Sequence, residues 1–167
     1  MYLILVIGHT GQGKSTWVNN SIKGKRQYIF DVNNEYKHLP PDTAPAPQMR
    51  NVTLDIKKFI TICDTLQNTN IVFEDATGFL RGRQAPDMAR LLVKKRHSGN
   101  NYFILFHSIN RVPPELLEMS NFVILFKTND NAVQVEKKFH NYRLNNAFLQ
   151  LQKMKKYSFL NLKMIEQ

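Results

Sequence analysis

One octapeptide near the N-terminus has the residue types and spacing needed to bind phosphate. Residues 8–15 are Gly-His-Thr-Gly-Gln-Gly-Lys-Ser, and they follow an apolar run over residues 2–7. The glycines allow a tight turn in which consecutive backbone N–H groups point at phosphate oxygens. At this spacing, Lys14 reaches the β- and γ-phosphates of a nucleotide and Ser15 ligates Mg²⁺. The pattern therefore predicts that the chain binds a nucleoside triphosphate together with Mg²⁺.

The nucleotide is expected to be ATP, because the sequence contains no motif of the kind that GTPases use to recognise guanine. The expected binding residues are consecutive: Gly8, His9, Thr10, Gly11, Gln12, Gly13, Lys14, Ser15 and Thr16. Of these, His9 and Gln12 occupy variable positions of the pattern. The alternative is a glycine-rich turn that binds no phosphate.

Two carboxylates follow a second apolar run. Residues 70–73 are Asn-Ile-Val-Phe, and Glu74 and Asp75 come next. In phosphoryl-transfer sites one carboxylate holds Mg²⁺, and a neighbouring one orients or deprotonates the attacking water. We assign Glu74 to the metal and Asp75 to the water, and the reverse assignment stays open. The non-catalytic alternative is that Asp75 caps a helix.

Polar residues also follow the apolar run at residues 102–106. These are His107, Ser108 and Asn110. In a parallel sheet they would lie at the same edge as the acidic pair. One of them is expected to sense the γ-phosphate or position water, and we prefer Ser108 to the other two. The alternative is that the polar residue caps the turn formed by the following prolines.

Arg96 is the candidate for a catalytic arginine. It lies near the end of a helix predicted from Pro86 to His97, just before Ser98 and Gly99. From this position it could reach a neighbouring subunit. An arginine supplied in this way stabilises the charge that develops in phosphoryl transfer. An ordinary surface arginine is the alternative.

Positive charge is concentrated in two segments. The net charge is +10. Residues 81–111 contain seven Lys and Arg and one acidic residue, and residues 132–167 contain seven Lys and Arg and two acidic residues. Blocks of one sign in a nucleotide-binding domain favour a polyanionic partner, and nucleic acid is the expected one. Solubility alone is the alternative. The expected nucleic-acid-binding residues are Arg81, Arg83, Arg90, Lys94, Lys153, Lys155 and Lys156.

Short apolar runs alternate with helix-like stretches along the chain. The expected strands are residues 2–7, 27–32, 70–75, 102–107 and 122–127, and the expected helices are residues 14–23, 55–67, 86–97 and 131–142. The alternation predicts an α/β fold with a mostly parallel sheet flanked by helices. Residues 39–50 are proline-rich and predict a surface loop, and residues 147–152 and 157–163 predict a C-terminal antiparallel β-hairpin.

Length and composition predict one domain over residues 1–167. Cys63 is the single cysteine, so neither a disulfide framework nor a thiol metal site is expected. The sequence has no secretory signal pattern and no apolar run of membrane-spanning length. We therefore expect a soluble protein in the cytoplasm.

Beyond the phosphate loop and the acidic pair, three further features resemble one family. Residues 28–36 include an Asp followed four residues later by Glu-Tyr; residues 96–99 have the form Arg-x-x-Gly; and His107-Ser108 occupy the place of a polar sensor. In these features residues 2–127 resemble the FtsK/HerA superfamily of hexameric DNA-pumping ATPases, and within it the compact viral genome-packaging ATPases. The sequence departs from the family in having Ser108 in place of the usual Gln and in the inverted order Glu74-Asp75.

The resemblance implies a RecA-like P-loop ATPase that assembles as a homo-oligomeric, hexameric ring. ATP would bind between subunits, Arg96 would act on the neighbouring subunit's nucleotide, and hydrolysis would move DNA. The implied partners are DNA, bound without sequence preference and expected to be double-stranded, and a viral capsid or its vertex. The cytoplasm would be that of the host cell if the protein is viral, with association with the virion as an alternative. Two alternatives from other classes remain: a small P-loop nucleoside or nucleotide kinase, and an assembly ATPase of the filamentous-phage type.

Overall fold

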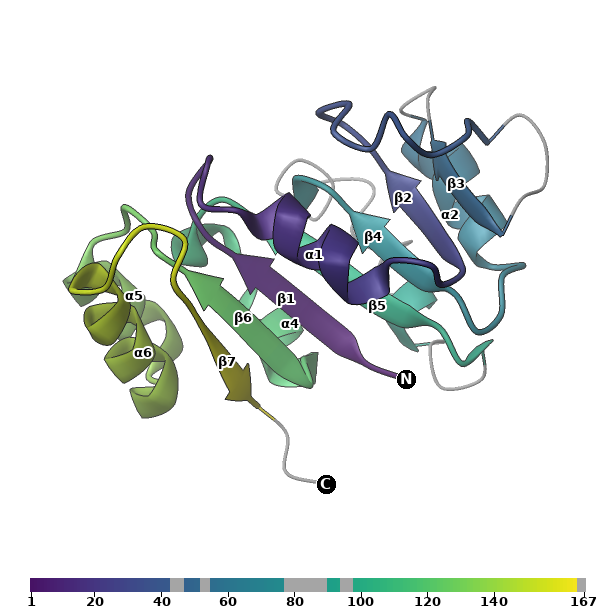
Figure 1. The fold of residues 1–167 in the computed structure, drawn as a ribbon. Coiled ribbons are helices and arrows are strands. Elements are labelled where there is room, and N and C mark those ends of the chain that lie inside the picture. Colours follow the sequence, from purple (N-terminus) through teal and green to yellow (C-terminus); the bar gives the residue numbers. More distant parts are fainter. Residues whose placement is uncertain (43–46, 52–54, 77–89, 94–97, 165–167) are drawn as a thin grey trace.

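The computed structural model describes residues 1–42, 47–51, 55–76, 90–93 and 98–164. Seven strands form one sheet in the order β3-β2-β4-β5-β1-β6-β7 (Figure 1). The strands are β1 (Leu3–Ile7), β2 (Gln27–Phe30), β3 (Gln48–Asn51), β4 (Asn70–Phe73), β5 (Asn101–Phe106), β6 (Phe122–Phe126) and β7 (Phe159–Lys163). All neighbouring pairs are parallel except β6 and β7, which are antiparallel. The predicted α/β fold with a mostly parallel sheet and an antiparallel C-terminal strand is confirmed.

Helices cover both faces of this sheet. They are α1 (Lys14–Ile22), α2 (Ile56–Cys63), α4 (Pro114–Met119), α5 (Ala132–Phe139) and α6 (Tyr142–Gln152), with a short 3-10 turn, η2 (Ile109–Arg111). In Figure 1, α1 crosses the near face and α4 lies behind the sheet. No helix in the described residues is both long and apolar enough to cross a bilayer.

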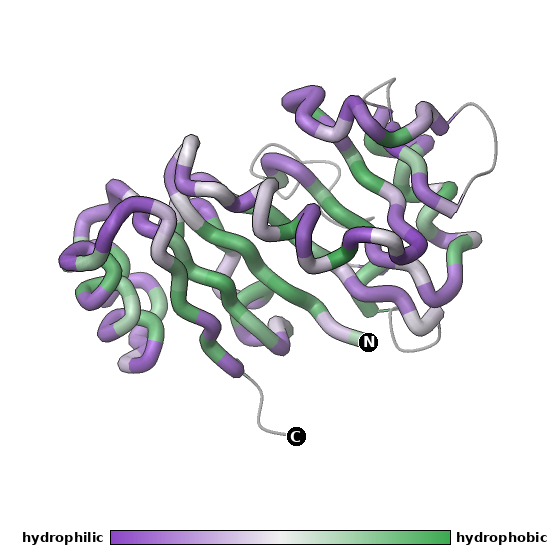
Figure 2. Tube along the Cα trace, viewed as in Figure 1, coloured by the Kyte–Doolittle hydropathy of each residue, from purple (hydrophilic) through white to green (hydrophobic). Residues whose placement is uncertain are grey.

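The core consists of two apolar layers separated by the sheet. Alternate residues of β1 enter opposite layers: Leu5 belongs to the layer that contains residues of α2, α4 and α6, whereas Val6 belongs to the layer that contains residues of α1. Every residue of β1 is buried, as expected for a central parallel strand covered on both faces. Figure 2 shows hydrophobic residues concentrated along the central strands and hydrophilic residues along the loops. The carboxyl ends of β1, β4 and β5 are therefore held rigidly side by side.

The sheet contains one strand that the sequence did not indicate. Residues 39–50 were expected to be a surface loop, but Gln48–Asn51 form β3 and pair in parallel with β2 at the sheet edge. Met49 and Asn51 are buried, and Asn51 Nδ2 donates to Asp42 Oδ2 at 2.8 Å. A strand with one apolar residue is specified by its pairing partner, since its own pattern is too weak.

The C-terminal antiparallel pair has a different first strand from the one predicted. Its second arm forms β7, but the strand pairs with β6, and the predicted first arm, residues 147–152, belongs to α6. Leu144, Ala147, Phe148 and Leu151 are the buried residues of α6, which is the spacing of one helix face. Asn141 caps this helix by accepting a hydrogen bond from the Leu144 N–H at 3.0 Å. The predicted helix over residues 131–142 ends earlier, at Phe139, because its C-cap residue His140 has φ of 46°.

Candidate active site

The glycine-rich loop connects β1 to α1 and is fastened to both neighbours of β1. Gly8 N donates to Phe106 O at 3.0 Å, and His9 N donates to Lys127 O at 2.9 Å. A Cβ at Gly8 would lie 2.5 Å from Phe126 Cβ, so no larger residue fits at this point. Gly13 has φ of 92° directly before the first turn of α1, a conformation that favours glycine. The loop therefore has a fixed shape and leaves the N–H groups at the start of α1 open to an anion.

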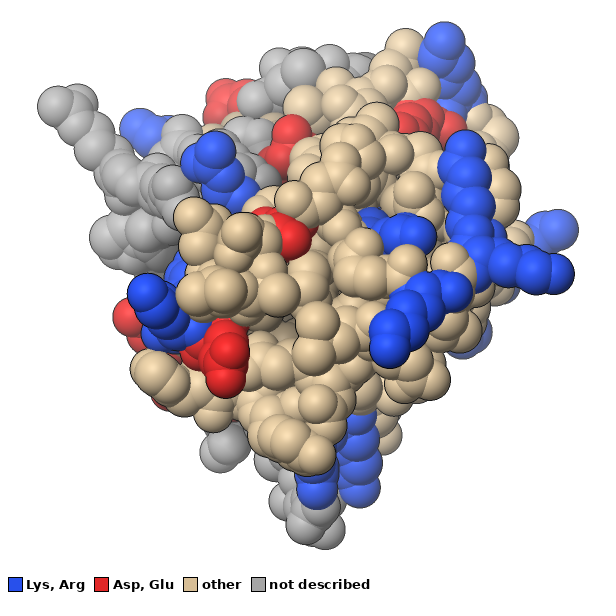
Figure 3. Space-filling view, turned by 90° about the vertical axis from the view of Figure 1, so that its left-hand side faces the viewer, with Lys and Arg blue, Asp and Glu red and all other residues tan. Residues whose placement is uncertain are grey.

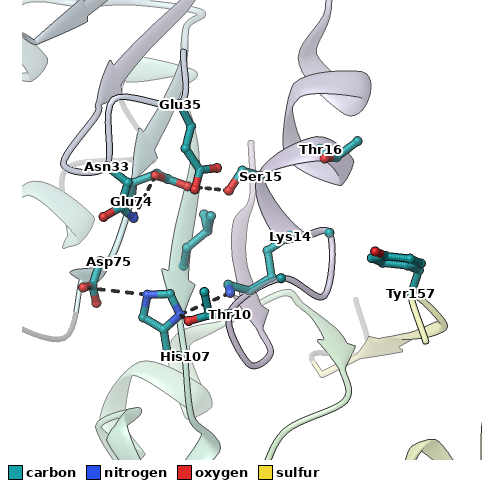
Figure 4. A pocket seen from close by; sticks show the side chains of 13 residues that line it. Thr10, Lys14, Ser15, Thr16, Asn33, Glu35, Glu74, Asp75, His107 and Tyr157 are labelled. Carbon is teal, nitrogen blue, oxygen red and sulfur yellow. Dashed lines mark hydrogen bonds and ion pairs between the residues drawn. The ribbon is translucent and has the colours of Figure 1, made fainter. Parts of the chain in front are cut away.

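A cavity of about 520 Å³ lies at this loop (Figure 4). It brings together most of the residues predicted to bind nucleotide with both acidic residues. The predicted residues that line it are Thr10, Gly11, Gly13, Lys14, Ser15, Thr16, Glu74 and Asp75, and the others are Asn33, Glu35, Leu105, His107 and Tyr157. Gly8, His9 and Gln12 shape the loop but do not line the cavity.

Glu74 is the most strongly constrained acid of the cavity. Its side chain accepts hydrogen bonds from Ser15 Oγ at 2.6 Å and from Asn33 Nδ2 at 3.3 Å. Burial raises the pKa of Glu74 to about 7; the Ser15 hydrogen bond partly opposes this shift, and the negative charge of Glu35 adds to it. A carboxylate in this setting is stabilised by a cation, and the pair formed by Ser15 and Glu74 is the donor set that the sequence predicted for Mg²⁺.

Lys14 places its ammonium in the centre of the cavity. The residue is 6% exposed, and its Nζ donates to His9 O at 3.3 Å and lies 3.3 Å from His107 Nδ1. Burial lowers the Lys14 pKa, and the nearby Glu74 carboxylate acts in the opposite direction. This buried cation is the counter-charge that a triphosphate requires.

Asp75 and His107 form the third part of the site. Asp75 Oδ2 lies 3.7 Å from His107 Nε2, and the Asp75 backbone has φ of 48°. Burial, followed by the positive charge of Lys14, lowers the His107 pKa and so favours the neutral ring. Because an ammonium can only donate, Nδ1 of that ring must accept from Lys14, so the proton sits on Nε2 and faces Asp75.

Ser108, the residue we preferred as the sensor, does not line the cavity. Its hydroxyl donates to Asp130 Oδ1, while Asp130 Oδ2 accepts from Ile109 N at 2.8 Å. Asn110 also lies outside the cavity, and its Nδ2 donates to Gln134 Oε1 at 3.3 Å. Successive residues at the end of an extended strand point in opposite directions. Of the three candidates, His107 is therefore the one that faces the site.

The sequence reasoning missed four lining residues. Asn33 and Glu35 follow β2, which lies next to β4, and polar residues after a strand at this edge were the available signal. Leu105 is an apolar residue within β5 and gives no such signal. Tyr157 follows the turn after α6, so its position depended on the fold of the C-terminal segment.

The remaining predicted site residues are on the surface or outside the described residues. Arg96, Arg81, Arg83 and Lys94 lie outside the described residues. Arg90 is exposed and lies 3.4 Å from Asp64. Lys153, Lys155 and Lys156 are exposed in the segment between α6 and β7. Figure 3 shows the face that carries α5 and α6, where Lys and Arg are most numerous on the right, and Asp and Glu lie mostly on the left beside further Lys and Arg.

A metal ion would need ligands from the nucleotide as well as from the protein. The part of the chain that the structure describes has no group of three or more His, Cys, Asp or Glu residues able to hold a metal ion. Mg²⁺ at nucleotide sites is commonly held by one or two protein oxygens together with phosphate oxygens and water. Ser15 Oγ and Glu74 Oε1, 2.6 Å apart, fit that arrangement.

Solved structures share this fold. The genome-packaging NTPase B204 of Sulfolobus turreted icosahedral virus 2, in complex with AMPPCP, superposes with a TM-score of 0.77 at 17% identity over 98% of this chain and 92% of that one. B204, the DNA-packaging ATPase of Sulfolobus turreted icosahedral virus, gives 0.76 at 16% identity with the same coverage. The N-terminal domain of zonular occludens toxin from Neisseria meningitidis gives 0.50 at 15% identity over 77% of this chain and 78% of that one.

No protein-family model matches the sequence, and no curated protein matches it. At the level of the fold, the predicted resemblance to compact viral packaging ATPases is confirmed.

Proposed function

We propose that this chain is an ATP hydrolase that drives DNA translocation, most specifically a viral genome-packaging ATPase. The observation that carries the proposal is the convergence of Lys14, Ser15 and Glu74 on one cavity at the carboxyl ends of β1 and β4. The shared fold with B204, which has been determined with AMP, AMPPCP and ATP-γS, supports nucleotide as the occupant.

We assign roles to five of the lining residues from their positions. The start of α1 and Lys14 bind the phosphates, and Ser15 and Glu74 would hold Mg²⁺. The metal, when bound, offsets the charge that develops on the phosphates. Asp75 orients the attacking water and accepts its proton. His107, with its proton on Nε2, holds Asp75 and Lys14 in place beside the γ-phosphate.

The proposal extends to an oligomer and to DNA. Arg96 of one subunit would reach the nucleotide of the next, which makes hydrolysis depend on assembly into a ring. The basic segments would contact the phosphate backbone, which makes DNA binding independent of sequence and sensitive to salt. The net charge of +10 supports this partner, and so does the likeness to B204, a DNA-packaging ATPase.

The decisive experiment measures the ATPase rate per subunit as a function of protein concentration, with and without long double-stranded DNA. A rate that rises with concentration and with DNA supports a ring motor. A panel of nucleosides and nucleotides is included as phosphate acceptors. Transfer to one of them, unaffected by DNA, would identify a kinase and refute the packaging proposal.

Two arginine variants separate assembly from nucleotide binding. Arg96→Ala should bind ATP as tightly as the unmodified chain but lose the increase in rate with concentration. Arg26→Ala is the matched control, since Arg26 is an exposed arginine outside both basic segments and outside the cavity. If Arg96→Ala keeps the full concentration-dependent rate, the role of Arg96 is wrong.

A further inference from the structure

Tyr157 has an unusual position for an exposed aromatic residue. Its side chain lines the nucleotide cavity although 59% of the residue is exposed. Its backbone has φ of 68°, in the left-handed region. A bulky residue is rare there and costs of order 1 kcal/mol or more, so the surrounding structure must hold it in place.

Aromatic packing holds this turn against the phosphate loop. Phe159, two residues later, opens β7 and pairs in register with Phe126, the last residue of β6. The Phe159 ring centroid lies 5.4 Å from that of Phe126 and 6.0 Å from that of Trp17 in α1. On the other side of the turn, Gln152 Nε2 donates to Thr128 O at 2.9 Å. Both ends of the turn are therefore attached to elements next to the loop.

The ring itself lies at the loop backbone. A Cβ built on Gly13 would be 3.5 Å from Tyr157 Cδ1, which is van der Waals contact. Figure 4 shows Glu74 and Asp75 on one side of Lys14 and Tyr157 on the other. The cavity thus has an acidic end and an aromatic end, with the buried cation between them.

This polarity fixes the direction of a bound nucleotide. The γ-phosphate belongs near Lys14 and the acidic pair, so the nucleoside must leave the cavity at the opposite end, where Tyr157 lies. Lys156 Nζ is 4.9 Å from the ring centroid and covers one face of the ring. Most of the residue is nevertheless exposed, and an aromatic ring is a flat surface of the kind on which nucleobases stack.

We propose that Tyr157 is the platform on which the base of the bound nucleotide stacks. The inference rests on the proposed function, in that a nucleoside triphosphate occupies the cavity. The C-terminal turn that carries Tyr157 would then belong to the nucleotide site. Through this turn the site would bind a nucleotide more tightly than a bare polyphosphate.

The test compares the affinity for Mg²⁺·AMPPCP with that for Mg²⁺·tripolyphosphate by titration calorimetry. Tyr157→Ala should weaken AMPPCP binding about tenfold, a typical loss for one base–aromatic stack, and leave tripolyphosphate binding within twofold. Tyr157→Phe keeps the ring and should bind both as the unmodified chain does. Tyr142→Ala is the matched control, because Tyr142 is an exposed tyrosine of α6 that does not line the cavity.

The outcomes separate this inference from the proposed function. If Lys14→Ala loses both ligands while Tyr157→Ala binds AMPPCP normally, the platform is refuted and the nucleotide site stands. If Tyr157→Ala weakens both ligands equally, the turn shapes the phosphate loop and does not bind the base, so the inference is again refuted. If the unmodified chain binds neither ligand, the proposed function fails and the inference with it.

Discussion

Ser15 Oγ donates to Glu74 Oε1 at 2.6 Å, and this contact joins the first turn of α1 to the end of β4. The two residues are far apart in sequence but close in space, because the strands that precede them, β1 and β4, both flank β5. Asn33 Nδ2 donates to the other oxygen, Glu74 Oε2. Glu74 is thereby held at the phosphate loop in a buried position that favours its protonated form when no cation is present.

Replacing Glu74 should stabilise the nucleotide-free protein at high pH. Its pKa is about 7 in the fold against an ordinary value of 4.5, so between these pH values the folded state binds a proton that the unfolded chain releases. The free energy of unfolding therefore falls as the pH rises from about 4.5 to 7. Glu74→Gln lacks this titration and should be more stable than the unmodified chain by roughly 1–3 kcal/mol at pH 8, with little difference at pH 4.5.

Urea unfolding with EDTA present, at pH 4.5 and pH 8, measures this difference. Glu118→Gln, an exposed glutamate of α4, is the control and should change neither value. A stability difference for Glu74→Gln that stays the same at both pH values would contradict the shifted pKa. The same variant should lose ATP hydrolysis, because an amide cannot supply the charge that Mg²⁺ requires.

Lys14→Ala should abolish measurable turnover and weaken nucleotide binding at least tenfold. The buried ammonium is expected to make charge-assisted hydrogen bonds to phosphate, each worth about 1.5–3 kcal/mol. Calorimetric titration with AMPPCP checks the affinity. Lys23→Ala, an exposed lysine just after α1, is the control. Unchanged affinity in Lys14→Ala would mean that the cavity is not the phosphate site.

Gly8→Ala should destabilise the fold by about 1–3 kcal/mol through overpacking. The added Cβ would lie 2.5 Å from Phe126 Cβ, and rotating the phenyl ring cannot relieve this contact. Gly24→Ala separates sterics from backbone strain, because a Cβ at Gly24 meets nothing within 4 Å although φ is +75°. It should cost about 1 kcal/mol. Thermal unfolding of both variants tests the ranking, and a larger loss for Gly24→Ala would overturn it.

The three lysines before Tyr157 should contribute to DNA binding through charge alone. Replacing Lys153, Lys155 and Lys156 by Ala should reduce the slope of log K against log salt by about 0.9 for each DNA phosphate that these side chains neutralise. Replacing three exposed lysines elsewhere, Lys23, Lys37 and Lys57, removes the same charge and is the control. Equal effects of the two sets would mean that net charge, and not this turn, attracts DNA. AMPPCP affinity must be measured in parallel, since the turn borders the nucleotide cavity.

The features that were predictable from the sequence are those specified by local patterns. The five apolar strands, the glycine loop and the acidic pair each depend on a short run of residues, and all have the positions expected. Strand β3 was missed because Gln48–Asn51 contain a single apolar residue, so that pairing with β2 specifies the strand. Residues 147–152 predicted a strand because apolar and polar residues alternate over 149–152. The helical spacing of α6 becomes visible only when Leu144 is included in its buried face.

The choice between His107 and Ser108 needed tertiary information. Both residues follow β5, and the direction of each side chain depends on how the chain leaves the strand. Asp130, which comes after β6, accepts from Ser108 and from the Ile109 N–H and fixes that exit. No pattern near residue 108 indicates a partner that lies 22 residues away in the sequence.

His107→Ala and Ser108→Ala should therefore differ in what they lower: the first should lower kcat and the second the stability. His107 lies between Lys14 Nζ, at 3.3 Å from its Nδ1, and Asp75 Oδ2, at 3.7 Å from its Nε2. Its removal leaves both charged groups less well positioned and should lower kcat at least tenfold, with thermal stability nearly unchanged. Ser108 lies outside the cavity and donates to Asp130. Its removal should leave kcat within about twofold and lower the stability by about 1 kcal/mol.

Steady-state ATPase assays and thermal unfolding of the two variants decide between the residues, because each variant is the control for the other. His107→Gln sharpens the test, since a glutamine can still accept from Lys14 and donate toward Asp75. It should recover part of the activity that the alanine variant loses. If Ser108→Ala instead loses kcat while His107→Ala retains it, Ser108 is the sensor that the sequence suggested, and the cavity must rearrange when nucleotide binds.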